Sequence, residues 1–174
     1  GYGTLGAHVA KTLKMFGFPV RAWSRSQRSE GSDSGGVALY HGAAGFDACV
    51  SGARILVNLL PLTPETVDVL NASLFAKLAQ GAFLINVARG AHLVEADLLA
   101  ALESAQIAGA TLDVFRTEPL PADHPFWREP RITVTPHISA LMLRDETVAQ
   151  IAGKIAALER GEAITGIVDL TRGY

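Results

Sequence analysis

The chain opens with Gly1-Tyr2-Gly3-Thr4-Leu5-Gly6, a G-x-G-x-x-G turn that leads into apolar residues spaced as one helix face. In a dinucleotide site, the first glycine permits a tight turn, the second gives the pyrophosphate room and the third lets the helix lie close to the sheet. Backbone N–H groups at the helix start then bind the phosphates. The turn therefore predicts dinucleotide binding, although such a motif alone is a weak signal. The predicted contacts are Gly1, Gly3, Thr4, Leu5 and Gly6.

The strand expected over 20–23 indicates which dinucleotide fits. In an NAD site the end of this strand carries an acidic residue for the ribose 2'-hydroxyl, whereas two arginines follow here. A guanidinium can bind a 2'-phosphate through paired hydrogen bonds, so the pattern favours NADPH, with NADH as a poorer alternative. The other interpretation is that both arginines are solvated loop charges. The residues expected to contact this end of the cofactor are Ser24, Arg25, Ser26 and Arg28.

Strand and helix patterns alternate along the rest of the chain. Strands are expected over 37–40, 55–60, 82–86, 108–113 and 132–135, and helices over 46–51, 95–104 and 146–159. Thr63 and Pro64 indicate an N-cap and a first helical position, so a further helix is expected after them. The run over 55–60 is apolar throughout, as in a strand buried on both faces. This alternation predicts an α/β fold with a doubly wound parallel sheet of the Rossmann type.

Composition excludes several classes of protein. The 174 residues are 49% hydrophobic and carry a formal charge of -2, which gives no basis for nucleic-acid binding. Cys49 has no partner for an internal disulfide, and no uncharged apolar run is long enough to span a membrane, so a cytoplasmic protein without membrane contact is expected. The histidines share no metal-ligand spacing with cysteine or carboxylates, and no metal is predicted. The histidines considered were His8, His41, His92 and His124.

Several ordered motifs carry a family resemblance across essentially the whole chain. Beyond the glycine turn they are 60–66 (LPLTPET), 85–90 (INVARG), 112–115 (LDVF), 118–121 (EPLP) and 136–138 (PHI). Together they resemble the D-isomer-specific 2-hydroxyacid dehydrogenases. Residues 16–19, 23–26, 95–102 and 172–174 are similar to the glyoxylate/hydroxypyruvate reductase branch. The resemblance implies reduction of glyoxylate to glycolate and of hydroxypyruvate to D-glycerate with NADPH.

The resemblance also implies three catalytic residues. Arg89 would hold the carboxylate of a 2-keto acid and polarise its carbonyl. His137 would act as the general acid that protonates the carbonyl oxygen. Glu118 would orient the imidazole and stabilise its protonated form. Each of the three follows a different strand, and such loops converge at the carboxyl edge of an α/β sheet.

Further cofactor contacts are implied by the same motifs. Asp113 matches the position that holds the nicotinamide carboxamide, and its alternative role is a backbone cap at a strand end. Apolar residues at strand ends are expected to line the cofactor, although such residues are core by default. The remaining implied contacts are Leu60, Pro61, Val87, Ala88, Arg89, His137 and Ser139.

Two alternative functions stay open. The chain could belong to a 2-hydroxyacid dehydrogenase of broader or phosphoglycerate-type specificity; the formate branch is disfavoured because it has glutamine in place of Glu118. It could also be a dinucleotide-sensing regulatory protein of the same fold. The range of accepted substrates would distinguish the first alternative from a glyoxylate/hydroxypyruvate reductase. Cofactor binding without turnover would favour the second.

The chain is expected to be a fragment. It would comprise a dinucleotide-binding domain over 1–140 and a helix and tail over 141–174, and it would lack the first strand of the sheet and most of the substrate domain. The apolar stripe of the helix over 146–159 would return towards that absent domain. A homodimer of the full-length protein is implied by the resemblance.

These 174 residues alone should therefore be unstable. Without the central strand, its neighbours lack ladder partners and leave apolar faces exposed. Thermal and urea denaturation of the isolated chain, followed by circular dichroism, should give broad transitions. A sharp cooperative transition of soluble material would contradict this expectation.

Overall fold

A computed structural model describes residues 1–26, 35–140 and 143–168. The chain divides into two compact units, 1–136 and 137–174. The elements of the first unit are α1 (Thr4–Met15), β1 (Arg21–Ser24), β2 (Ala38–His41), α2 (Gly42–Val50), β3 (Ile55–Asn58), α3 (Ala72–Phe75), β4 (Ala82–Asn86), the 3-10 helix η1 (Gly90–His92), α4 (Glu95–Glu103), β5 (Ile107–Leu112), the 3-10 helix η2 (Pro125–Arg128) and β6 (Ile132–Val134). The second unit contains α5 (Arg144–Glu159).

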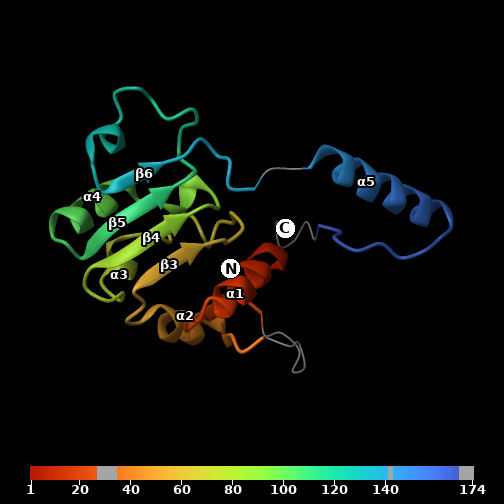
Figure 1. Cartoon of the computed structure of the whole chain (residues 1–174), viewed down its shortest axis with the longest axis horizontal. Helices are drawn as coiled ribbons and strands as arrows, with labels where there is room; N and C mark the ends of the chain where they lie inside the picture. The colour runs from red at the N-terminus through yellow and green to blue at the C-terminus, as the bar shows by residue number, and fades with distance from the viewer. Residues whose placement is uncertain (27–34, 141–142, 169–174) are drawn as a thin grey trace. The chain divides into compact units, whose positions relative to one another are not determined.

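Among the described residues of the first unit, every strand pairing is parallel. One sheet has the order β3-β4-β5-β6, and β1 pairs with β2 in a second, two-stranded sheet. Parallel neighbours that follow one another in sequence need a crossover, and helices supply most of them here. Figure 1 shows that the arrows of β3 to β6 point in one direction. The predicted α/β class with a parallel, Rossmann-type sheet is confirmed, and the carboxyl ends of four strands share one edge.

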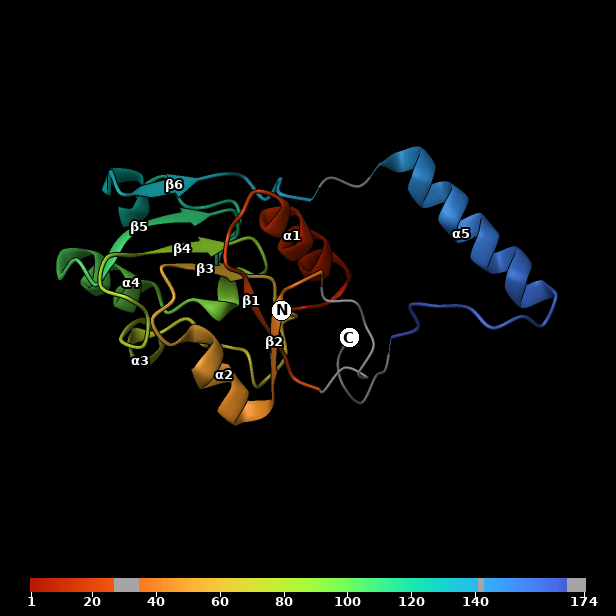
Figure 2. The same ribbon diagram turned by 60° about the horizontal axis from the view of Figure 1, so that its bottom comes forward.

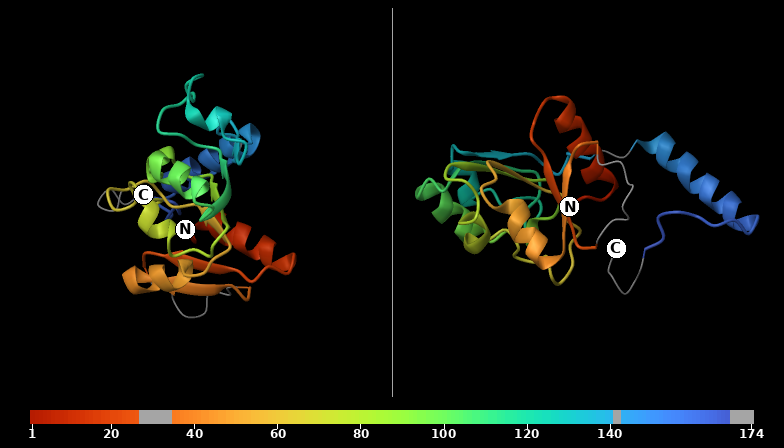
Figure 3. Two further views of the ribbon diagram at one scale, coloured as in Figure 1. Left: turned by 90° about the vertical axis from the view of Figure 1, so that its left-hand side faces the viewer. Right: turned by 90° about the horizontal axis from the view of Figure 1, so that it is seen from below.

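The main core lies between the four-stranded sheet and the helices α3 and α4, which cover one of its faces (Figures 1 and 3). Its largest fully buried side chains include Phe75, Leu84, Leu98 and Leu112. Burial of each such side chain contributes about 1.5–3 kcal/mol. This core holds β4 and β5 rigidly, so the loops at their carboxyl ends start from fixed positions.

The two-stranded sheet carries a helix on each face (Figure 2). Side chains alternate along β1, so Ala22 packs with α1 through a small cluster around Ala10, whereas Trp23 meets Phe46 of α2 edge to face at 5.1 Å. The Trp23 indole also donates a hydrogen bond to the Gly42 carbonyl (2.7 Å). These contacts fix the end of β1 next to the start of α2.

The prediction of a helix directly after Thr63 is wrong. Residues 64–68 form turns, and the next helix begins only at Ala72. The Thr66 hydroxyl accepts a hydrogen bond from the Thr63 amide and donates one to the Pro61 carbonyl (both 2.8 Å), which closes a local turn in place of a helix. The N-cap is instead Asn71, whose side chain accepts a hydrogen bond from the Leu74 amide.

Other boundaries and burial patterns also differ from expectation. The strand expected over 55–60 ends at Asn58, and it is not buried on both faces, because Ile55 is 50% exposed. This strand pairs with β4 alone among the described residues and is an edge of its sheet. The helix expected over 46–51 starts earlier, at Gly42, where a positive φ of 66° lets the chain turn directly out of β2.

The helix of the second unit is regular and exposed. It spans 16 residues, and none of its side chains is buried. The predicted apolar stripe is present on it at Val148, Ile151, Ile155 and Leu158, each more than half exposed. Gly161, with φ of 72°, follows the helix as expected for its C-terminal stop.

The close approach of η1 to the end of β5 generates a stability prediction. A Cβ on Gly90 would lie 1.8 Å from the carbonyl carbon of Phe115, which is backbone and cannot move aside alone. Gly90→Ala should therefore destabilise the fold by about 3 kcal/mol, seen as a lower urea midpoint of the whole protein.

A matched control is available on α5. A Cβ on Gly153 would meet nothing within 4 Å, so Gly153→Ala should stabilise its helix by about 0.5–1 kcal/mol. Equal urea midpoints for the two variants would contradict the proposed contact.

Candidate active site

The glycine turn lies against the carboxyl end of β3. A Cβ on Gly1 would be 2.4 Å from the Leu59 carbonyl oxygen, and one on Gly6 would be 1.9 Å from the Gly1 carbonyl oxygen. Both positions therefore require glycine for close backbone packing. A Cβ on Gly3, in contrast, would meet nothing within 4 Å, so its surroundings are open.

The start of α1 is suited to an anion. Gly3 is its N-cap, no side chain caps it, and its first turn contains no acidic residue. The first backbone N–H groups of a helix lack intrahelical acceptors and carry the positive end of the helix dipole. The open space at Gly3 would admit a phosphate beside these donors, including those of Thr4 and Leu5. The turn therefore fits a dinucleotide pyrophosphate.

The turn after β1 presents Arg25 to solvent. The Ser24 hydroxyl donates to the Ser26 carbonyl (2.9 Å), and the Arg25 carbonyl accepts from the Gly42 amide (3.3 Å). The pKa of the Glu65 carboxyl is lowered, mainly by a hydrogen bond from Thr63 and in smaller part by the positive charge of Arg25. The charge of Arg25 therefore acts on Glu65 in the segment that follows β3. Arg28, also predicted here, lies outside the described residues.

The turn after β4 carries Arg89. The segment Val87–Ala88 leads to this residue, which is exposed and directly precedes η1. Its guanidinium donates to the Ala88 carbonyl (2.6 Å), while its own carbonyl accepts from the Asn86 side chain (3.2 Å). The buried Asn86 side chain therefore holds the backbone of this turn, and the Arg89 side chain is exposed.

The loop after β5 carries Asp113 and Glu118. Asp113 is only 1% exposed, and its carboxylate accepts a hydrogen bond from the Thr135 hydroxyl (2.5 Å). The exposed Glu118 carboxylate accepts from the Phe115 amide (2.9 Å). Because Gly90 packs on the Phe115 backbone, the turn of Arg89 and the loop of Glu118 are held side by side.

Other contacts hold the same loop. Arg116 forms an ion pair with Asp68 and donates to the Leu93 carbonyl (2.8 Å). The Trp127 indole donates to the Pro121 carbonyl (2.8 Å). Each contact ties the loop after β5 either to itself or to the segments next to η1, so Glu118 is carried by a braced loop.

The remaining predicted residues fall in the second unit. His137 is its first residue, is exposed and has a φ of 56°, in the left-handed region that non-glycine residues seldom adopt. Ser139 follows it and is also exposed. Arg89, Glu118 and Asp113 are brought to one sheet edge within the first unit, and His137 and Ser139 belong to the other unit.

A buried polar cluster was missed by sequence reasoning. Asn58 and Asn86 end β3 and β4 and pair with each other in register, and His92 of η1 contacts Asn58. All three side chains are at most 3% exposed. The available signal was an asparagine at the end of two apolar strands, ILVN and AFLIN, where an apolar core residue would be expected.

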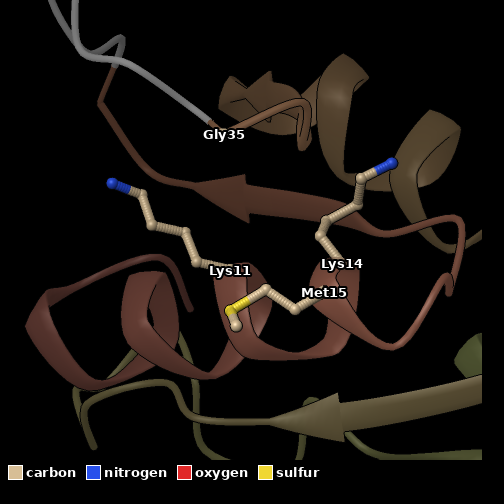
Figure 4. A pocket seen from close by; sticks show the side chains of 4 residues that line it. All are labelled: Lys11, Lys14, Met15 and Gly35. Atoms are coloured by element: carbon tan, nitrogen blue, oxygen red, sulfur yellow. The ribbon is translucent and has the colours of Figure 1, made fainter.

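Two cavities lie in the first unit. An open depression of about 310 Å³ is lined by Lys11, Lys14, Met15 and Gly35. Figure 4 shows the two lysine ammonium groups pointing away from each other, so they do not converge on one anion. A smaller cavity of about 120 Å³ lies beside the loop that carries Glu118 and is lined by Arg116, Thr117, Leu120 and Pro121. Its other lining residues are Glu95 and His124, whose side chains are 3.3 Å apart.

The described residues contain neither a cluster of metal ligands nor a helix that could span a membrane. Within residues 1–26, 35–140 and 143–168, no group of three or more histidine, cysteine or acidic side chains could hold a metal ion. In the same ranges, none of the helices combines the length and apolarity needed to cross a membrane.

The chain is similar to proteins of known family over its whole length. Residues 1–139 match the family model of the D-isomer specific 2-hydroxyacid dehydrogenase, NAD binding domain. The chain is 56% identical over 174 residues to a glyoxylate/hydroxypyruvate reductase A of Serratia proteamaculans, covering 100% of this chain and 54% of the relative. It therefore spans about half the length of this curated relative.

Two solved structures are similar over the whole chain. A D-isomer specific 2-hydroxyacid dehydrogenase from Xanthobacter autotrophicus, in complex with NADPH and MES, is 44% identical with a TM-score of 0.92, and 70% of it is covered. An NADPH-dependent glyoxylate/hydroxypyruvate reductase from Sinorhizobium meliloti, in complex with NADP and sulfate, is 41% identical with a TM-score of 0.92, and 55% of it is covered. With a family model matched over 139 residues, this chain belongs to the D-isomer specific 2-hydroxyacid dehydrogenases, of which it carries the NAD binding domain.

Proposed function

We propose that the whole protein reduces short 2-keto acids with NADPH, converting glyoxylate to glycolate and hydroxypyruvate to D-glycerate. The observation that carries this proposal is the juxtaposition of Arg89 and Glu118, whose segments are joined where Gly90 packs on Phe115. A cationic group for a carboxylate and an acidic group for a histidine then lie at one sheet edge. The glycine turn lies at the end of β3, which belongs to the same edge.

Arg89 is the proposed anchor of the substrate. Its guanidinium is exposed, while its backbone is held by the buried Asn86. A planar guanidinium forms two parallel hydrogen bonds with a carboxylate, which fixes the substrate's orientation as well as its position. In this role it would also withdraw electron density from the neighbouring carbonyl group.

His137 and Glu118 are the proposed acid and its orienting partner. Reduction of a ketone needs a proton on the oxygen as a hydride reaches the carbon, and histidine can give up a proton at neutral pH. Glu118 has one carboxylate oxygen held by the Phe115 amide. In this proposal the carboxylate also accepts from the imidazole and stabilises its positive charge.

The dinucleotide supplies the hydride when it is bound. Gly3, Thr4 and Leu5 would hold its pyrophosphate at the start of α1, and Leu60, Pro61, Val87 and Ala88 would line it. Asp113 would accept a hydrogen bond from the nicotinamide carboxamide, with Thr135 donating to the same carboxylate. A fixed carboxamide determines which ring face is presented to the keto acid.

Arg25 supports a preference for NADPH. It is exposed at the end of β1, where an acidic residue would repel a 2'-phosphate. In Arg25→Asp, the ratio of kcat/KM with NADPH to that with NADH should fall by about 10- to 100-fold, because charge-assisted hydrogen bonds to the phosphate are lost.

The matched control for this change is Arg54→Asp. Arg54 is also exposed but precedes β3, at the opposite end of the strand from the glycine turn. Steady-state kinetics with both cofactors should show its preference unchanged. An unaltered ratio in Arg25→Asp would mean that Arg25 is only a solvated loop charge.

The open space at Gly3 yields a second prediction. Gly3→Ala should lower the urea midpoint of the whole protein only slightly, because the added methyl group meets no protein atom and the remaining cost is the poorer N-cap that alanine makes. It should nevertheless weaken NADPH binding about tenfold or more, because that methyl group would occupy the place of the pyrophosphate. Fluorescence titration with NADPH measures the affinity, and unchanged affinity would place the phosphates elsewhere.

The role of His137 is tested by His137→Ala. NADPH oxidation with glyoxylate or hydroxypyruvate should slow by about 10²- to 10⁴-fold, the usual contribution of a general acid, while NADPH affinity changes little. The exposed His8→Ala serves as the control and should retain full activity. Tight NADPH binding with no turnover of any short 2-keto acid by the unchanged protein would overturn the reductase proposal in favour of dinucleotide sensing.

A further inference from the structure

The polar cluster at the ends of β3 and β4 is the most unusual part of the core. The Asn58 amide nitrogen lies 3.0 Å from the Asn86 side-chain oxygen and 2.9 Å from His92 Nδ1. His92 Nε2 lies 3.3 Å from the Pro61 carbonyl oxygen. Burial of three polar side chains is costly unless each is hydrogen-bonded, and in the described part of the chain no buried side-chain nitrogen or oxygen lacks a partner.

Backbone groups fix the orientation of both asparagine amides. The Leu60 amide donates to Asn58 Oδ1 (3.2 Å), so the other terminal atom of Asn58 is its nitrogen. The Ala88 amide donates to Asn86 Oδ1 (3.3 Å), and Asn86 Nδ2 donates to the Arg89 carbonyl (3.2 Å). A backbone N–H can only donate and a carbonyl can only accept, which leaves no freedom to exchange O and N.

The protonation state of His92 follows from these orientations. Asn58 Nδ2 has two hydrogens, one directed to Asn86 and one to His92 Nδ1, so Nδ1 must be an acceptor. The ring proton is therefore on Nε2, which donates to the Pro61 carbonyl. Burial lowers the pKa of His92, the hydrogen bond to the Pro61 carbonyl opposes this in part, and the positive charge of Arg89 lowers the pKa further. The net lowering agrees with a neutral ring.

The cluster ends on the segments that carry the proposed site. Through Asn86 it holds the backbone of Ala88 and Arg89, and through Asn58 and His92 it holds Leu60 and Pro61. The His92 backbone itself belongs to the Arg89 turn, because its amide donates to the Arg89 carbonyl (3.2 Å). The His92 side chain thus connects the turn after β4 to the segment after β3.

We propose that His92, as the neutral Nε2–H tautomer, is a positioning residue that fixes the Arg89 turn relative to the Leu60–Pro61 segment, with Asn58 and Asn86 completing the unit. This inference rests on the proposed function, in which Arg89 holds the keto acid and Pro61 lines the nicotinamide cofactor. The unit then sets the separation between the carbonyl carbon and the hydride donor. Hydride transfer is sensitive to such spacing, because a misplacement of about 1 Å can cost about 10²-fold in rate.

Two substitutions of His92 distinguish its hydrogen bond to Pro61 from its hydrogen bond to Asn58. Glutamine places an amide nitrogen near the position of Nε2 and can still donate to Pro61, whereas the shorter asparagine reaches only the position of Nδ1 and can still accept from Asn58. In His92→Asn, kcat should fall by about 10- to 100-fold, and the primary isotope effect with 4-deuterated NADPH should rise as hydride transfer becomes rate-limiting. His92→Gln should recover most of the activity.

A destabilised control separates positioning from folding. Gln106→Ala removes hydrogen bonds to the Phe75 and Leu78 carbonyls at the amino end of β5 and lowers the stability of the fold, but it touches neither segment of the site. Its kcat per folded molecule and its isotope effect should match those of the unchanged protein. Equal kcat and isotope effects in His92→Asn and the unchanged protein, or equal losses in the two His92 variants, would overturn the positioning role.

The tautomer of His92 can be measured directly by NMR, without any enzymatic turnover. Long-range ¹H–¹⁵N correlation spectra of the whole protein should show a single His92 ring with an unprotonated Nδ1 and a protonated Nε2 at neutral pH. A protonated Nδ1 would overturn the hydrogen-bond assignment. Absence of turnover in the unchanged protein would instead overturn the proposed function and the positioning role with it, so the two failures are distinguishable.

Discussion

The approach of Gly90 to the Phe115 backbone is the contact on which the geometry of the site depends. It brings the turn after β4 against the loop after β5, so that Arg89 and Glu118 share one edge of the sheet. A side chain of any size at residue 90 would separate these loops. The contact is possible because β4 and β5 are themselves held in parallel register by an apolar core that includes leucine and phenylalanine side chains. The positions of Arg89 and Glu118 at the edge of the sheet therefore depend on the packing of the core beneath β4 and β5.

The buried asparagines extend this arrangement to β3. Asn58 and Asn86 face each other across the strand pair, and their amides satisfy backbone groups of the turns that follow. A purely apolar core would leave those turns to be positioned by loop sequence alone. Three neighbouring turns, those of Leu60–Pro61, Arg89 and Phe115, are therefore fixed by two mechanisms, close backbone packing and directional hydrogen bonds. Such preorganisation is what a hydride transfer needs.

Much of this fold could be predicted from local pattern. The strand over 82–86 was predicted to the residue, because its apolar run is bounded by Gly81 and a turn. The prediction of a helix after Thr63 was wrong because the Thr66 hydroxyl closes a competing turn and Asn71 supplies a better cap. The asparagine cluster was missed because strand register, which pairs Asn58 with Asn86, is not visible in either strand alone. The assigned roles of Arg89, Glu118 and His137 came from motif order and remain predictions, since residue spacing does not specify contacts across loops.

The proposed roles of Arg89, Glu118 and His137 are tested most directly by a crystal structure of the whole protein with NADPH and oxamate, a non-reducible analogue of a short 2-keto acid. The oxamate carboxylate should pair with the Arg89 guanidinium through two hydrogen bonds of about 2.7–2.9 Å. His137 should then contact the oxygen that represents the substrate carbonyl, with Glu118 on its other ring nitrogen. An oxamate bound away from Arg89, or a His137 imidazole that contacts neither oxamate nor Glu118, would contradict these roles.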